Sequence, residues 1–145
     1  MTEIIIGGRT IPLLYTSYEL IAIQKDIGCT GFQLRDDVFG IYLADEDDPK
    51  SVRMKVAVEP ERTEKLCKLI RILGNAGLEE KGGAPDLTDK WVMRQIRPAM
   101  ILPYAVTVLA EIIEGNNMES PKAEEQKGPV DEGLEEEIAK KQPGS

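Results

Sequence analysis

The sequence predicts an α+β fold in which helices predominate. Short apolar runs that are typical of strands lie within the first 58 residues, and from residue 60 onward apolar residues recur at helical spacing. After residue 116 the chain becomes polar and acidic and contains no aromatic residue, so it lacks the apolar surface needed to fold. We therefore expect a globular domain over 1–116, with three to four helices, and a disordered acidic tail over 117–145.

An N-terminal β-hairpin is predicted over residues 3–15. Residues 4–6 are a run of isoleucine that is typical of a short strand. Gly7-Gly8 is a signal for a tight turn, and residues 9–15 return as the second strand.

A helix should follow this hairpin. Thr16 and Glu19 fit a capping box, in which each side chain bonds a backbone N–H group near the start of the helix. Gly28 is well placed to end the helix. The expected apolar face comprises Leu20, Ile23 and Ile27.

The segment 34–58 allows two interpretations. Spacing that suits a helix face is found at Leu34, Val38, Ile41 and Tyr42. Strand-like alternation is found at Phe39, Ile41 and Leu43, and again after the acidic loop 45–49 at Val52, Met54, Val56 and Val58. We favour a second hairpin, which would pair residues 38–44 with 52–58.

Two amphipathic helices are predicted between residues 60 and 98. The clearest helical pattern in the chain is formed by Leu66, Leu69, Ile70 and Leu73. Gly74 and Gly77 should end this helix, and residues 79–85 should form a loop. Asp86 is the expected cap of the next helix, which carries Leu87, Trp91 and Val92 and should stop near Pro98.

The segment 100–114 is apolar on nearly every side, so we expect a buried helix. It would be either the central helix of the core or a helix completed by a partner subunit, and Pro103 should start it or kink it. The apolar stretch 99–113 is shorter than the ~20 residues that span a membrane, and it contains Glu111. We therefore expect no membrane span.

Catalytic chemistry finds little support in the sequence. The chain has no histidine, the commonest general base and metal ligand at neutral pH. Its two cysteines, Cys29 and Cys67, lack Cys-x-x-Cys spacing and should be buried small side chains. The acidic run 45–48 lacks the ligand pattern of a calcium loop. We expect no catalytic residues, no cofactor and no metal site, and hence no enzyme.

Charge and composition narrow the expected partners and location. There are 26 acidic and 18 basic residues, a formal charge of −8, which disfavours binding to nucleic acid. The N-terminus lacks the basic and then apolar pattern of a signal segment, so we expect a soluble cytoplasmic protein. The solvent side of the 61–73 helix should carry Arg62, Lys65, Lys68 and Arg71. A small basic and aromatic patch for an acidic partner is suggested by Trp91, Arg94 and Arg97.

The order of these parts resembles the tail assembly chaperones of long-tailed phages and prophages. The matching pieces are residues 4–13, 18–28, the apolar helix 66–78 that ends in Ala-Gly-Leu, and the acidic 135–141; the segment 34–58 departs from the family. The resemblance implies a cytoplasmic, non-enzymatic protein that coats the tape-measure protein and recruits tail-tube subunits. It also implies a longer form made by ribosomal frameshifting.

Apolar helix faces are the expected protein-binding surfaces, either for a client or in a homo-oligomer. The candidate residues are Leu66, Leu69, Ile70, Leu73, Trp91, Ile101, Val108, Leu109, Ile112, Val130, Leu134 and Ile138. Two other functions fit the composition. One is a phage structural component, such as a head–tail connector or tail-completion protein. The other is an acidic regulatory module that mimics DNA or sequesters a basic protein.

Overall fold

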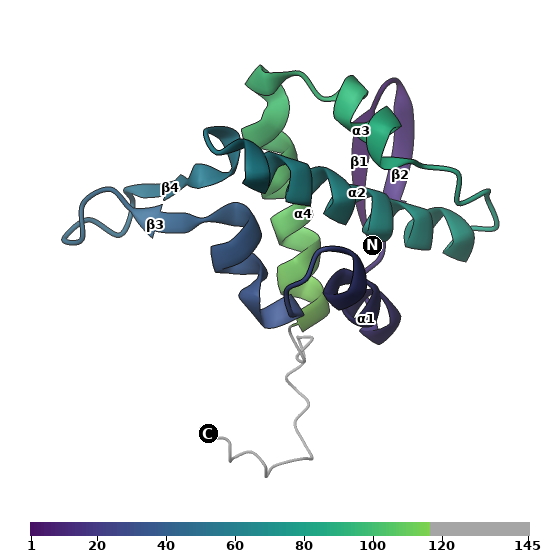
Figure 1. The fold of residues 1–145 in the computed structure, drawn as a ribbon, viewed down its shortest axis with the longest axis horizontal. Coiled ribbons are helices and arrows are strands. Elements are labelled where there is room, and N and C mark those ends of the chain that lie inside the picture. The colour runs from purple at the N-terminus through teal and green to yellow at the C-terminus, as the bar shows by residue number, and fades with distance from the viewer. Residues whose placement is uncertain (117–145) are drawn as a thin grey trace, which may run out of the picture. The chain divides into compact units, whose positions relative to one another are not determined.

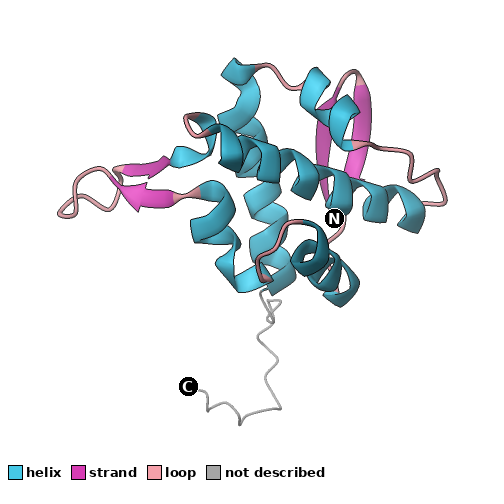
Figure 2. Ribbon diagram, in the orientation of Figure 1, coloured by secondary structure: helices cyan, strands magenta, loops and turns pink. Residues whose placement is uncertain are grey.

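The computed structural model describes residues 1–116, and contacts within Met1–Ile112 make that part of the chain one compact unit. Helices and two separate antiparallel hairpins make up the described residues, which confirms the α+β class with helices in the majority (Figure 2). The predicted tail 117–145 lies outside the described residues, and so do Val130, Leu134 and Ile138.

Four strands and four α-helices are found in residues 1–116. The strands are β1 (Thr2–Ile6), β2 (Arg9–Leu13), β3 (Ile41–Leu43) and β4 (Val52–Met54). The α-helices are α1 (Ser17–Asp26), α2 (Pro60–Glu80), α3 (Asp89–Gln95) and α4 (Ile101–Asn116). Shorter helical turns are η1 (Gly31–Gln33), η2 (Arg35–Phe39), η3 (Lys55–Ala57) and η4 (Pro98–Met100).

The first hairpin and the helix after it agree with the sequence prediction. In the β1–β2 pair, Ile4 faces Ile11, and the turn at Gly7 and Gly8 has φ of 57° and 78°, which glycine adopts without strain. The start of α1 carries the predicted capping box. The Thr16 N–H donates to Glu19 Oε1 at 2.8 Å, and Thr16 Oγ1 accepts from the Tyr18 N–H at 3.3 Å.

The segment 34–58 combines both interpretations of its sequence. A second hairpin exists, but it is shorter than predicted and pairs Ile41–Leu43 with Val52–Met54. Residues 35–39 form a π-helical turn, which buries Val38 and Phe39 in the core. The predicted strand alternation fails beyond Met54, because a 3₁₀ turn follows and buries Val56. Helical turns at both ends of the hairpin bury these apolar side chains, which a short two-stranded ribbon alone could not cover.

The predicted end of α2 at Gly74 and Gly77 is wrong, because the helix continues to Glu80. These glycines instead allow close packing within the domain. A Cβ on Gly77 would lie 1.8 Å from the carbonyl oxygen of Pro12, and one on Gly74 would lie 2.6 Å from Leu87 Cδ1. Helix α2 therefore rests almost backbone to backbone on β2, as its position beside the first hairpin in Figure 1 shows.

Helix α2, and not α4, is the central helix of the domain. It contacts β2, α1, α3 and the turns η2 and η3. The backbone N–H of Leu14, just after β2, donates to the carbonyl of Leu73 at 3.1 Å. Contacts on so many sides explain why the apolar face of α2 is fully buried.

Helix α3 begins at Asp89, and its cap is Thr88, not the predicted Asp86. The Thr88 hydroxyl oxygen accepts the Trp91 N–H at 3.1 Å. The helix ends at Gln95, close to the predicted stop before Pro98. The residues from Lys81 to Thr88 form the loop that leads into it.

Helix α4 covers Ile101–Asn116, so Pro103 lies in its first turn, where proline is tolerated. Pro98–Asn116 is the one segment of the described chain long and apolar enough to cross a membrane by length and composition. Its buried side, which includes Ala105, Val108 and the Glu111 carboxylate, belongs to the domain core. We therefore treat α4 as a helix of a soluble domain.

Candidate protein-binding surface

Most of the residues predicted to bind a partner lie inside the domain. The buried members of that set are Leu66, Leu69, Ile70, Leu73, Ile101, Val108 and Ile112. Leu109 and Trp91 are half-buried and pack against the core. The amphipathic face of α2 is thus covered by the rest of this chain, and it offers no surface to a partner while the domain keeps its fold.

The outer face of α4 is an apolar surface that the rest of the domain leaves uncovered. Leu102, Val106 and Ile113 are 44%, 57% and 56% exposed. Half-buried Leu109 joins them along the helix, and the exposed Pro103 and Ala110 lie beside them. No charged side chain interrupts this α4 outer face, which is unusual for a solvated surface and marks a candidate interaction site.

Three hydrogen bonds from two α4 side chains fix the opposite side of the helix to β1 and to the segment just after β2. The buried Glu111 carboxylate accepts the Thr2 N–H at 3.0 Å and the Tyr15 N–H at 3.3 Å. The Tyr104 hydroxyl donates to the carbonyl oxygen of Ile5 at 2.7 Å. These bonds hold the rotation of α4 about its axis, so that Glu111 points inward and the apolar face points outward. The exposed side chain of Ile5 lies on the strand that Tyr104 contacts.

A second apolar patch lies on α1 and the turn η1. Tyr18, Ile21 and Phe32 are 79%, 57% and 81% exposed. A hollow of about 320 Å³ in this patch is lined by Leu20, Ile21, Gln24, Lys25, Thr30 and Phe32. The turn that carries Phe32 is ordered by Gln33, whose Oε1 accepts the Thr30 N–H at 2.9 Å. Sequence reasoning missed this patch, because Phe32 follows no helical or strand period.

An apolar groove of about 370 Å³ lies where α2, α3 and α4 approach one another, and Cys67 is part of its wall. Burial, reinforced by the nearby Asp89 and Glu64 charges, raises the pKa of the Cys67 thiol to about 11. Burial and the charge of Asp37 also raise the pKa of Cys29. Both thiols are free and buried, so they act as small core side chains, as predicted, and not as nucleophiles.

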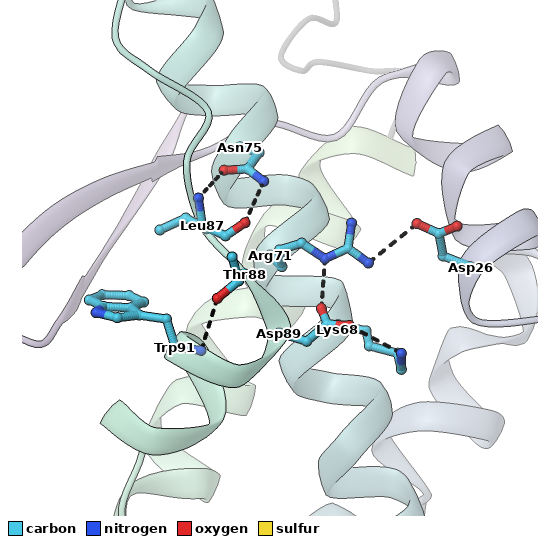
Figure 3. Close-up of polar contacts among 8 residues, drawn as sticks. All are labelled: Asp26, Lys68, Arg71, Asn75, Leu87, Thr88, Asp89 and Trp91. Carbon is cyan, nitrogen blue, oxygen red and sulfur yellow. Dashed lines mark hydrogen bonds and ion pairs between the residues drawn. The ribbon is translucent and has the colours of Figure 1, made fainter.

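An ion-pair network fixes α3 and α1 onto α2 (Figure 3). Asp89 bonds Arg71 Nε at 2.6 Å and Lys68 Nζ at 3.1 Å, and Arg71 Nη2 reaches Asp26 at 3.3 Å. Burial alone would raise the pKa of Asp89, but the bonds and charges of Arg71 and Lys68 outweigh burial and lower that pKa. Lys68 and Arg71 therefore have structural partners instead of forming the plain solvent face that was predicted.

The loop before α3 is held by the side chain of Asn75. Its Oδ1 accepts the Leu87 N–H at 2.9 Å, and its Nδ2 donates to the Leu87 carbonyl at 3.1 Å (Figure 3). A single amide thus satisfies both backbone groups of one loop residue. The loop and network residues together build a rigid frame around α2.

Trp91 has a partner other than the predicted Arg94 and Arg97. The guanidinium of Arg9 lies 5.7 Å from the centroid of the Trp91 ring, and Arg9 also bonds Asp86 at 3.2 Å. Trp91 therefore ties the turn of the first hairpin to α3. Arg94 and Arg97 are exposed.

Nothing in residues 1–116 brings three or more histidine, cysteine, aspartate or glutamate side chains together as metal ligands. Comparison of the whole chain with protein-family models, curated proteins and solved structures found no match.

Proposed function

We propose that this chain is a non-enzymatic phage or prophage tail assembly chaperone that works in the bacterial cytoplasm. Its client would be the tape-measure protein, and it would recruit tail-tube subunits to that client. The observation that supports this proposal best is the uncharged α4 outer face. A chaperone needs apolar surface that stays accessible in its folded state, and this face supplies it.

The shape of this face favours a helical client. Leu102, Val106, Leu109 and Ile113 follow one another at steps of four, three and four residues, which places them in one stripe along the helix. A stripe of this kind packs against the apolar stripe of another helix by fitting side chains between side chains. The resemblance to tail assembly chaperones supplies the identity of that helix, because their client is long and helical.

The rest of the surface fits the remaining parts of the proposal. The formal charge of −8 would keep a complex with an apolar client in solution. The patch of Tyr18, Ile21 and Phe32 belongs to different elements from α4, so it offers a separate surface for a tail-tube subunit.

Co-expression with the product of a neighbouring gene for a long helical protein tests this function. We expect the two proteins to co-elute in size-exclusion chromatography with light scattering, and the client to be soluble only when this chain is present. Val106→Glu should abolish co-elution, because it places a charge in the middle of the apolar stripe. Thr107→Glu adds the same charge at the next residue, outside the stripe, and should keep it.

Two results would refute the proposal. A client that stays soluble without this chain, and never co-elutes with it, would remove the chaperone function. Equal binding by the Val106 and Thr107 variants would remove the α4 outer face as its site. Val106 is a better probe than Leu109, because Leu109 packs partly against the core, so a charge there would also disturb the fold.

A further inference from the structure

We propose that the α4 outer face is self-complementary, and that in the absence of a client it is covered by α4 of a second copy in a weak homodimer. This inference rests on the proposed function and adds to it a way of regulating client binding, because the second copy would cover the face that the client uses. The dimer itself is inferred from the sequence and exposure of α4, so it can be tested without any client.

The exposed residues of α4 follow a heptad pattern. With Val106 and Ile113 at position a, Leu102 and Leu109 fall at position d, three or four residues apart throughout. β-Branched residues at a and leucine at d favour two-stranded packing over higher oligomers. The residue types on this face therefore match a pair of identical helices.

The surroundings of the seam allow two helices to approach closely. Pro103 and Ala110 flank it and are small, so they leave room for the side chains of a second helix. The acid of this segment, Glu111, is turned inward by its bonds to Thr2 and Tyr15. A second copy would therefore bury no unpaired charge along the seam from Leu102 to Ile113.

The size of the seam predicts weak association. Helix α4 has 16 residues and is about 24 Å long, slightly more than two heptads. Stable interfaces bury about 800 Å² per partner, and one helix face of this length supplies roughly half of that area. The dimer should therefore form and dissociate readily, which would leave the face available when a client helix competes for it.

Charge adds a distinctive salt dependence. Each copy carries a formal charge of −8, so two copies repel one another while their contact is apolar. Salt screens that repulsion without weakening the apolar contact. The dimer should consequently become tighter as salt rises, whereas binding to a basic partner would become weaker.

Sedimentation equilibrium of the full chain alone tests the proposal, over a range from about 1 μM to about 500 μM protein. We expect a monomer–dimer equilibrium with a dissociation constant of roughly 10–100 μM, tightening with added salt. Val106→Glu and Leu102→Gln should remain monomeric over the whole range. Thr107→Glu should dimerise like the parent chain, and circular dichroism should show all three variants folded.

Three outcomes would overturn the dimer. They are a parent chain that stays monomeric at the highest concentration, an assembly larger than two, or dimerisation of the Val106 and Leu102 variants with parental affinity. The proposed function is judged separately by co-elution. A monomeric chain whose binding to client depends on Val106 would refute the dimer alone, and a Val106-dependent dimer that binds no client would refute the function alone.

Discussion

Helices α2 and α4 are both rich in apolar residues, yet the domain buries the apolar residues of α2 much more completely than those of α4. The apolar face of α2 meets β2, α1, α3 and two helical turns, and Leu66, Leu69 and Ile70 are fully buried. Helix α4 buries one side and leaves Leu102, Val106 and Ile113 exposed. Here the helix with the clean amphipathic period is covered by its own domain, whereas the helix that is apolar all round keeps one apolar face exposed.

Replacing one apolar residue on each helix by glutamate should give the largest difference in stability. Leu69→Glu places an unpaired charge in the core, so we expect a loss of about 4 kcal/mol or more in the free energy of unfolding, enough to unfold a marginal domain. Val106→Glu changes an exposed side chain, and its effect should stay within about 0.5 kcal/mol.

Urea unfolding at dilute protein concentration, followed by circular dichroism, measures both values without a contribution from the dimer. Comparable losses in the two variants would show that the outer side of α4 is packed in solution. That result would remove the contrast between the helices.

The glycines of α2 provide a contrast within one helix. Gly77→Ala forces a methyl group against the Pro12 carbonyl, a backbone atom that cannot move alone, and should cost about 1–3 kcal/mol. Gly74→Ala meets side-chain atoms and no backbone atom: the end of the Leu87 side chain, which can rotate away, and Ile11 Cγ2 at 3.1 Å. The better helix propensity of alanine, worth about 1 kcal/mol, should make this second change nearly neutral.

Thermal unfolding of the two alanine variants checks this expectation, since each kcal/mol shifts Tm by several degrees in a domain of this size. A larger loss for Gly74→Ala than for Gly77→Ala would contradict it. In that case the approach of α2 to β2 would not be the tightest contact of the helix.

Local rules predicted the first hairpin, the capping box at Thr16 and the existence of each α-helix in residues 1–116. They failed where long-range packing decides. Gly77 looks like a helix end in sequence, but the neighbouring strand keeps the helix intact by filling the space beside it. A helical period places Leu69 on a face but does not say whether that face meets the core or a partner, and in the structure Leu69 is buried in the core.

The exposed surfaces needed three-dimensional information for the same reason. Val106 could not be distinguished from Val108 in a segment that is apolar on every side, because the inward side is set by the bonds of Glu111 to Thr2 and Tyr15. Those two backbone groups lie about a hundred residues away along the chain. The exposure of Phe32 could not be predicted either, because this residue lies on a short turn that has no helical or strand period.

The smallest expected effect on stability comes from the ion pairs, which connect α3 to α2 and do not involve α4. No ion pair in residues 1–116 involves α4, whereas Asp89 pairs with Arg71 and Lys68 of α2. Because these partners lower the pKa of Asp89 in the fold, their stabilisation is fully present above the ordinary pKa of about 3.9 and is lost as pH falls from there through the lowered pKa of the folded state. Asp89→Asn should therefore cost about 1 kcal/mol or less at pH 7 and nothing in strong acid.

Urea midpoints of the parent and the Asp89→Asn variant, measured from pH 7 down to about pH 2, test this sign. The two curves should converge as the pH drops below about 4, because protonated Asp89 no longer pairs with Arg71. Asp86→Asn is the matched control, since Asp86 belongs to the more exposed pair with Arg9 and should shift the curve less. A gap between parent and Asp89→Asn that stays constant down to pH 2 would mean that α3 is held on α2 by apolar packing alone.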